Sequence, residues 1–121
     1  MQTSQFRFVH HKLDAYRVAR ELADQCKVIA DRVPRGYRRW ADQLLRAAGS
    51  TVGLIGEGAN RFTAGQKRQK FTEARGEAGE VAAWVEQLES CGMVGEAEAV
   101  EVLTLADRVC AMLTGLIKRH S

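Results

Sequence analysis

The run from Arg46 to Arg61, RAAGSTVGLIGEGANR, constrains the fold more than any other part of the sequence. It places Gly49, Gly53 and Gly56 at helical spacing in a stretch that otherwise has the pattern of a buried helix. A glycine inside a helix costs about 1 kcal/mol relative to alanine, so three together cost roughly 2–3 kcal/mol. That cost is tolerable where the missing side chains let another backbone approach closely. The predicted partner is a small-residue stripe later in the chain, formed by Gly76, Gly79 and Ala83.

Length, composition and periodicity predict an all-α fold in a single domain, residues 1–121. The chain has 121 residues, of which 45% are hydrophobic, and a single proline, Pro34. Thr63 followed by Gln66 is a capping-box signature for the start of a helix. In that helix an apolar stripe recurs at spacings of three and four, as Phe71, Ala74, Ala78, Val81, Val85 and Leu88. Similar stripes predict an up-down-up-down four-helix bundle with helices at about residues 12–33, 37–60, 64–91 and 96–119.

The last predicted helix has two adjacent apolar stripes, which is more than the core of a lone bundle usually covers. Trp84 of the third helix lies one stripe away from the core positions of that helix. Exposed apolar surface of this kind is typical of subunit interfaces, so we predict a homo-oligomer. The alternative is a broad core-facing helix with Trp84 lying flat over the bundle. The predicted interface residues are Trp84, Val102, Leu105, Val109, Met112 and Leu116.

The sequence contains no pattern typical of a catalytic or metal site. His10 and His11 are adjacent, His120 lies near the other end of the chain, and no HxxxH, HExxH or ExxH pair occurs. Ser50 has no nearby histidine, and neither a GxSxG elbow nor a phosphate-binding loop is present. We therefore predict a protein that is not an enzyme and holds no metal and no cofactor.

Cysteine usage and hydropathy predict a soluble, cytoplasmic protein. Cys26, Cys91 and Cys110 are odd in number and widely spaced, and each falls at or beside a helical apolar position. We expect all three to be reduced core or near-core residues. The most membrane-like stretch, 47–56, is much shorter than the roughly 20 residues that a spanning helix needs, and no signal peptide is visible.

Five polar residues are embedded among small residues of the second and third predicted helices. Arg61 follows Glu57 by four residues, a spacing that allows an ion pair within one helix. Arg75 or Glu80 would complete a network between helices. We favour a structural network that fixes helix register, and a ligand or nucleic-acid contact is the alternative. The network comprises Ser50, Glu57, Arg61, Arg75 and Glu80.

The formal net charge of +3 conceals an asymmetry along the chain. Residues 1–75 carry fifteen Lys and Arg against seven Asp and Glu, a net of +8, whereas residues 76–121 carry three against eight, a net of −5. Such polarity steers an anionic partner to one surface, or lets basic and acidic surfaces of neighbouring subunits meet.

Two basic clusters near the starts of the second and third predicted helices are compatible with phosphate contacts to RNA or DNA. In an antiparallel bundle they would fall at opposite ends of neighbouring helices, unless subunit packing brings them together. Tyr37 and Trp40 interleave with the first cluster, where capping of the core is favoured over base stacking. The candidate nucleic-acid-binding residues are Arg35, Arg38, Arg39, Arg46, Lys67, Arg68 and Lys70.

Two motifs carry a family resemblance. The first comprises Arg46, Ala47, Ala48, Ser50, Ile55, Glu57, Gly58 and Arg61. The second comprises Phe71, Ala74, Arg75, Gly76 and Glu80. With these residues the chain resembles, over nearly its whole length, the bacterial four-helix-bundle proteins named for 23S ribosomal RNA intervening sequences. It departs from the family pattern at Val52 and Leu54, where proline and asparagine are frequent, and at Glu77, where serine is usual.

The resemblance implies a homo-oligomeric bundle, a pentamer around a central channel, and brings no catalytic residues. The resemblance extends to the accessory variability proteins of diversity-generating retroelements, which look like relatives of this fold. Those proteins are basic pentameric bundles that bind nucleic acid and a reverse transcriptase. The first hypothesis is therefore a non-enzymatic oligomer that binds RNA or DNA through its basic clusters as an accessory protein. The second is a protein–protein interaction scaffold with no nucleic-acid role, which binds a reverse transcriptase or another protein.

Overall fold

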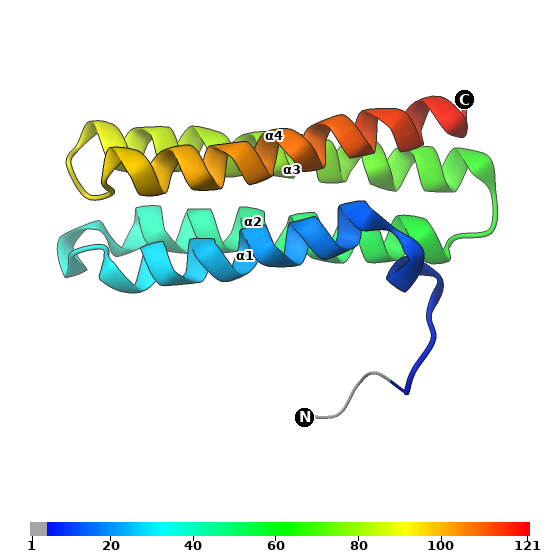
Figure 1. The fold of residues 1–121 in the computed structure, drawn as a ribbon, viewed down its shortest axis with the longest axis horizontal. Helices are drawn as coiled ribbons and strands as arrows, with labels where there is room; N and C mark the ends of the chain where they lie inside the picture. The colour runs from blue at the N-terminus through cyan, green and yellow to red at the C-terminus, as the bar shows by residue number, and fades with distance from the viewer. Residues whose placement is uncertain (1–4) are drawn as a thin grey trace.

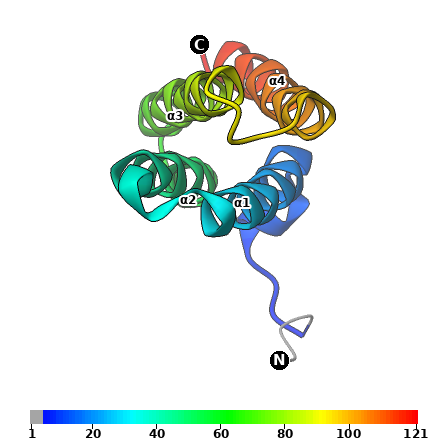
Figure 2. The ribbon, with the colours of Figure 1, turned by 90° about the vertical axis from the view of Figure 1, so that its left-hand side faces the viewer.

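Four α-helices joined by short turns make up the computed structural model, which describes residues 5–121. They are α1 (Asp14–Arg32), α2 (Arg38–Asn60), α3 (Ala64–Ser90) and α4 (Glu96–Arg119), with short 3₁₀ helices η1 (Val9–Lys12) and η2 (Arg35–Tyr37) before α1 and α2. Figure 1 shows the chain reversing its direction at each turn between the four helices. In Figure 2, α1 and α2 form one layer and α3 and α4 the other. The all-α prediction is confirmed, since the described residues contain no strand.

Local sequence explains where the helices begin and end. α1 stops just before Pro34, because the residue that precedes a proline is disfavoured in helical conformation. The predicted capping box begins α3: Thr63 Oγ1 accepts a hydrogen bond from the Gln66 backbone N–H at 3.1 Å, and Gln66 Oε1 accepts one from the Thr63 N–H at 3.4 Å. Beyond α3, Gly92 takes a φ of 78°, a left-handed conformation that glycine adopts without steric cost.

The core is formed by the stripe that each helix turns toward its neighbours. α1 and α3 each pack against both α2 and α4. The predicted stripe of α3, from Phe71 to Leu88, is buried at all six positions. Thr51 is the one buried polar residue among those described, and its Oγ1 donates to the Ala47 carbonyl at 2.8 Å. That bond removes the cost of burying the hydroxyl group.

The second stripe of α4 lies inside this core and does not form an exposed surface. Val102 and Val109 are fully buried, and Leu105 and Leu116 nearly so. The expectation of an exposed interface is wrong for these four residues, because α4 packs against both α1 and α3, and that contact buries a broad face of the helix. Met112 is half-buried. The alternative interpretation, a broad core-facing helix, describes α4 correctly.

The glycines of α2 are also placed differently from the prediction. A Cβ atom built at Gly49, Gly53 or Gly56 would have no other residue within 4 Å, and the same holds for the predicted partners Gly76 and Gly79. These positions face outward, so the predicted close packing between the two stripes is wrong.

The close approach occurs instead at Gly58, one stripe further round the helix. A Cβ there would lie 2.7 Å from Cε1 and 2.9 Å from Cδ1 of the buried Phe71 ring. Gly58 therefore allows this ring of α3 to press directly on the backbone of α2.

The three cysteines differ in their surroundings. Cys26 is buried, and burial raises the pKa of its thiol to about 12, which keeps it protonated and unreactive. Cys110 is half-buried, and burial also raises the pKa of its thiol. Cys91 is exposed, at the turn after α3, so the prediction of a core or near-core position is wrong for it.

We expect Gly58→Ala to destabilise the fold by about 1–3 kcal/mol, because the added methyl group must displace the Phe71 ring. Gly53→Ala on the same helix is the matched control. It meets no neighbour, so we expect it to stabilise the fold by roughly 0.5–1 kcal/mol. Thermal and urea unfolding measure both changes. Equal effects of the two substitutions would contradict the contact at Gly58.

Candidate nucleic-acid interface

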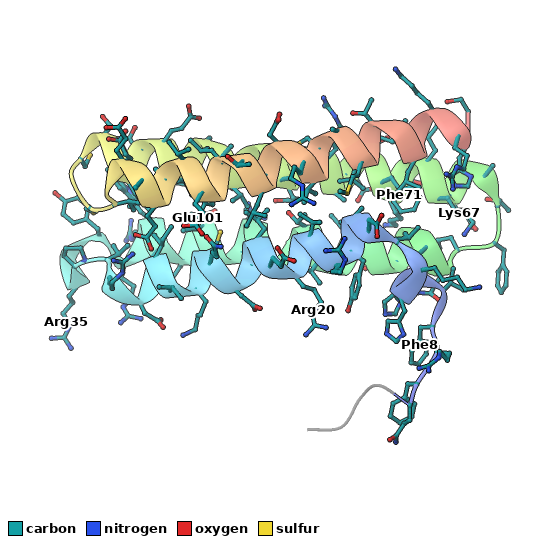
Figure 3. The ribbon with its side chains drawn as sticks, in the orientation of Figure 1. Phe8, Arg20, Arg35, Lys67, Phe71 and Glu101 are labelled. Atoms are coloured by element: carbon teal, nitrogen blue, oxygen red, sulfur yellow. The ribbon has the colours of Figure 1, made fainter. Side chains whose placement is uncertain are left out.

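The two predicted basic clusters lie at opposite ends of the bundle. Figure 3 shows Arg35 at the end that holds the α1–α2 turn and Lys67 at the other end, beside the α2–α3 turn. The 23 residues of α2 separate them, a length of about 35 Å. One chain therefore presents two separate basic regions rather than one continuous surface.

The cluster at the start of α3 is bound to the protein itself. Lys67 Nζ donates to the Ala59 carbonyl at 2.8 Å and so caps the last turn of α2. Arg68 Nη1 donates to the His120 carbonyl at 2.8 Å, and thus ties α3 to the end of α4. Lys70 Nζ lies 3.5 Å from the Glu57 carboxylate. These three cations serve the bundle, and a phosphate group would have to compete with their present partners.

Arg46 also has a partner within the protein. Its Nη1 lies 3.2 Å from Glu77 Oε1, and its Nη2 donates to Glu80, so the guanidinium group bridges α2 and α3. The hydrogen bond from Arg46 holds the pKa of Glu80 below its ordinary value, and the bonds to Glu80 and Glu77 raise the pKa of Arg46. Trp84 Nε1 adds a hydrogen bond to Glu80 at 3.3 Å. Arg46 is therefore a structural residue of the α2–α3 seam.

The five residues of the predicted polar network do not come together. Glu57 and Arg61 form the expected ion pair, at 3.5 Å. Arg75 instead reaches α4, where its Nε donates to Thr114 Oγ1 at 2.8 Å. Glu80 pairs with Arg46, and Ser50 is half-buried and bonds to none of the other four in the described part of the chain. Arg75 and Glu80 thus join helices through separate interactions, whereas the Glu57–Arg61 pair lies at the end of α2 alone.

The arginines at the α1–α2 turn form a different kind of cluster. Arg35, Arg38 and Arg39 are exposed, and within residues 5–121 none makes a hydrogen bond or an ion pair through its side chain. An open surface pocket of about 400 Å³ is lined by residues 35–40. Asp31 and Asp42 lie beside Arg35 and Arg38 in a neighbouring groove, and the Asp31 carboxylate is bound by a lysine of α1. We call Arg35, Arg38 and Arg39 the arginine cluster.

The N-terminus of α2 adds to the positive charge of the arginine cluster. Tyr37 occupies the cap position and provides no side-chain hydrogen bond, and the first turn of α2 contains no acidic residue. The backbone N–H groups at a helix start carry a partial positive charge, which favours anions there. Arg38 and Arg39 stand in this turn, where carboxylates are usually preferred.

Aromatic rings accompany the arginine cluster, and the structure separates their roles. Trp40 is half-buried, and its ring centroid lies 6.1 Å from that of Trp84 across the α2–α3 seam. Tyr37 touches Trp40 with 5.1 Å between centroids and keeps 44% of its surface exposed. Capping of the core, the interpretation favoured for both rings, fits Trp40. It does not account for the exposed ring of Tyr37.

Two classes of site are not found among residues 5–121. No group of three or more His, Cys, Asp or Glu side chains is arranged to hold a metal ion. No helix in this part of the chain has both the length and the apolar character needed to cross a membrane.

Residues 5–121 thus form a small all-α bundle of four helices, with an arginine cluster at one end that has no side-chain partner in this part of the chain. The family model of the 23S rRNA-intervening sequence protein matches residues 11–115. The chain therefore belongs to this family, and the resemblance noted in its two motifs is confirmed. No curated protein matches the chain.

The Arg46–Glu80 pair predicts a specific pH dependence of stability. Because the pKa of Glu80 is lower in the folded chain than its unperturbed value of 4.5, the pair stabilises the fold above that value. This contribution is lost as the pH falls from about 4.5 through the lowered pKa.

We therefore expect Glu80→Gln to be less stable than the wild type at neutral pH, with a smaller difference in acid. Urea unfolding at a series of pH values measures this. Glu86→Gln is the matched control, since Glu86 is exposed on the same helix and has no ion pair in the described part of the chain. A Glu80→Gln defect that stays constant with pH would contradict the assignment.

Proposed function

We propose that this protein is a non-enzymatic accessory protein that binds RNA or DNA through Arg35, Arg38 and Arg39. One observation carries the proposal. Of the seven basic residues that the sequence singles out, these three alone have no partner within residues 5–121, whereas the other four are bonded to carboxylates or carbonyl groups. A cation without a partner binds phosphate without first giving up an existing interaction.

Physical chemistry supports phosphate as the ligand. The planar guanidinium group donates two parallel hydrogen bonds to a phosphate, which lysine does not do. The start of α2 contributes backbone N–H groups of the same polarity beside Arg38 and Arg39. Contacts to the phosphate backbone carry little sequence information, so the proposed binding is strong at low salt and weakly selective.

We further infer that the protein is a homo-oligomer, a pentamer as the family resemblance implies. The buried stripe of α4 leaves other residues to form the interface, and the candidates are the exposed apolar side chains. Phe62, in the turn between α2 and α3, has 98% of its surface exposed, and Val28 and Val100 have more than half. Rotational symmetry in a ring would bring the arginine clusters of all subunits to one face, where several weak contacts act together.

The second candidate function is a protein–protein interaction scaffold. The same exposed apolar residues favour it, because a phenylalanine that touches almost nothing in its own chain is typical of a contact with another. A reverse transcriptase or another protein would then bind at the Phe62 end, away from the arginine cluster. This second function has no nucleic-acid role, so it predicts a wild-type protein without RNA affinity.

We expect a variant with Arg35, Arg38 and Arg39 all changed to Gln to bind RNA at least about tenfold more weakly than the wild type at low salt. The slope of log affinity against log salt should fall by about 0.7 for each phosphate of a single strand that the variant no longer neutralises. Fluorescence anisotropy with a labelled random RNA pool measures both.

The matched control changes three ion-paired cations of α1 to Gln, namely Arg17, Lys27 and Arg32. It removes the same net charge, so we expect a much smaller decrease in affinity. Equal decreases in the two triple variants would mean that overall charge, and not the arginine cluster, attracts RNA. A wild-type protein without affinity at low salt would refute the proposed function.

We expect Phe62→Ser to weaken the oligomer without affecting the stability of the subunit, because the ring has almost no contacts within the chain. Light scattering should give the wild type a mass above the 13.4 kDa of one chain, and the variant a lower mass at the same concentration. Val28→Ser tests the long side of the bundle in the same way. A monomeric wild type would contradict the oligomer, and an unchanged mass in Phe62→Ser would exclude this turn from the interface.

A further inference from the structure

The arginine cluster lines one surface pocket together with an aromatic ring that stays partly exposed. Tyr37 lies between Arg35 and Arg38 in the sequence and has 44% of its surface exposed. Its neighbour Trp40 is half-buried and packs in the α2–α3 seam beside Trp84, whose Nε1–H donates a hydrogen bond to Glu80. A partly exposed aromatic ring beside three cations that have no partner among the described residues suggests a ligand with both a flat apolar part and negative charge.

The ring is also held in place before any ligand arrives. The backbone N–H of Tyr37 donates to the Pro34 carbonyl at 2.9 Å and closes the 3₁₀ turn. Tyr37 then caps α2, and its ring contacts Trp40 with an interplanar angle of 62°. Because the turn and the helix start fix the backbone of this ring, a ligand loses little free energy in ordering it.

We propose that the arginine cluster binds single-stranded nucleic acid, with an unpaired base stacked on Tyr37 and the neighbouring phosphates bound by Arg35, Arg38 and Arg39. This inference rests on the proposed function and narrows it to one class of nucleic acid. Every base has a face that can stack on an aromatic ring, so such stacking tolerates any sequence.

Duplex is disfavoured by the same geometry. In a nucleic-acid duplex each base is stacked between its neighbours, so its faces are covered. Only the phosphates and the base edges in the grooves are accessible to the protein. Arginines alone bind either form, whereas an exposed ring adds affinity for unpaired bases only. The juxtaposition of Tyr37 with the three arginines therefore predicts a preference for single strands.

The experiment compares labelled oligouridine, which has no internal base pairs, with the same strand annealed to oligoadenosine. Fluorescence anisotropy at low salt gives the affinity of the full chain for each. We expect tighter binding of the single strand by the wild type. Tyr37→Ala should weaken single-strand binding roughly five- to hundredfold and leave duplex binding nearly unchanged, whereas Tyr37→Phe should keep the preference because the ring remains.

The matched control is Phe6→Ala, which removes a half-exposed ring that lies before α1 and belongs to neither the arginine cluster nor the proposed subunit contacts, so it should alter neither affinity. Thermal unfolding of each variant shows whether the bundle is intact. If the wild type binds oligouridine and Tyr37→Ala binds it equally well, the inference is wrong and the proposed function stands. If the wild type binds neither form of RNA, the proposed function fails, and the exposed ring with its arginines is better explained as a contact for a protein.

Discussion

The contact between Phe71 and the backbone of α2 at Gly58 is the constraint on which the rest of the bundle depends. It brings α3 against α2 within a few residues of the turn that joins them. Lys67 caps the end of α2 from the same side, and further along the seam Arg46 meets Glu77 and Glu80. With α2 and α3 fixed in this register, α1 and α4 each have two neighbours against which to bury their apolar faces.

Much of this fold is predictable from the sequence, because helix ends and apolar stripes are local signals. The capping box at Thr63 and the stop at Pro34 lie where the sequence indicates, and the helix bounds differ from those expected by at most two residues. Register between helices is not local. The sequence shows several glycines in α2 but not which of them faces α3. A signal for Gly58 was nevertheless present, since the core stripe through Thr51 and Ile55 continues to it at a spacing of three.

The candidate site divides in the same way between local and distant information. A cation in a turn between helices, such as Arg35, has few neighbouring side chains. Its lack of an ion-pair partner among the described residues can therefore be expected from its place in the sequence. Arg46 is paired because Glu77 and Glu80, 31 and 34 residues away in the sequence, lie beside it in the fold. Arg68 likewise donates to a carbonyl group 52 residues away. The sequence identifies Arg35, Arg46 and Arg68 alike as basic residues. Only the packed structure separates those that hold helices together from those that remain available to a ligand.

The end of α4 has a practical consequence for how the protein can be attached to something else. Arg68 binds the carbonyl group of His120, which places the C-terminal end of the described chain beside the start of α3 (Figure 1). That position is a full helix length, about 35 Å, from the α1–α2 turn. A fusion partner, dye or sensor surface coupled through Ser121 would thus stand at one pole of the bundle and leave the opposite pole facing open solution.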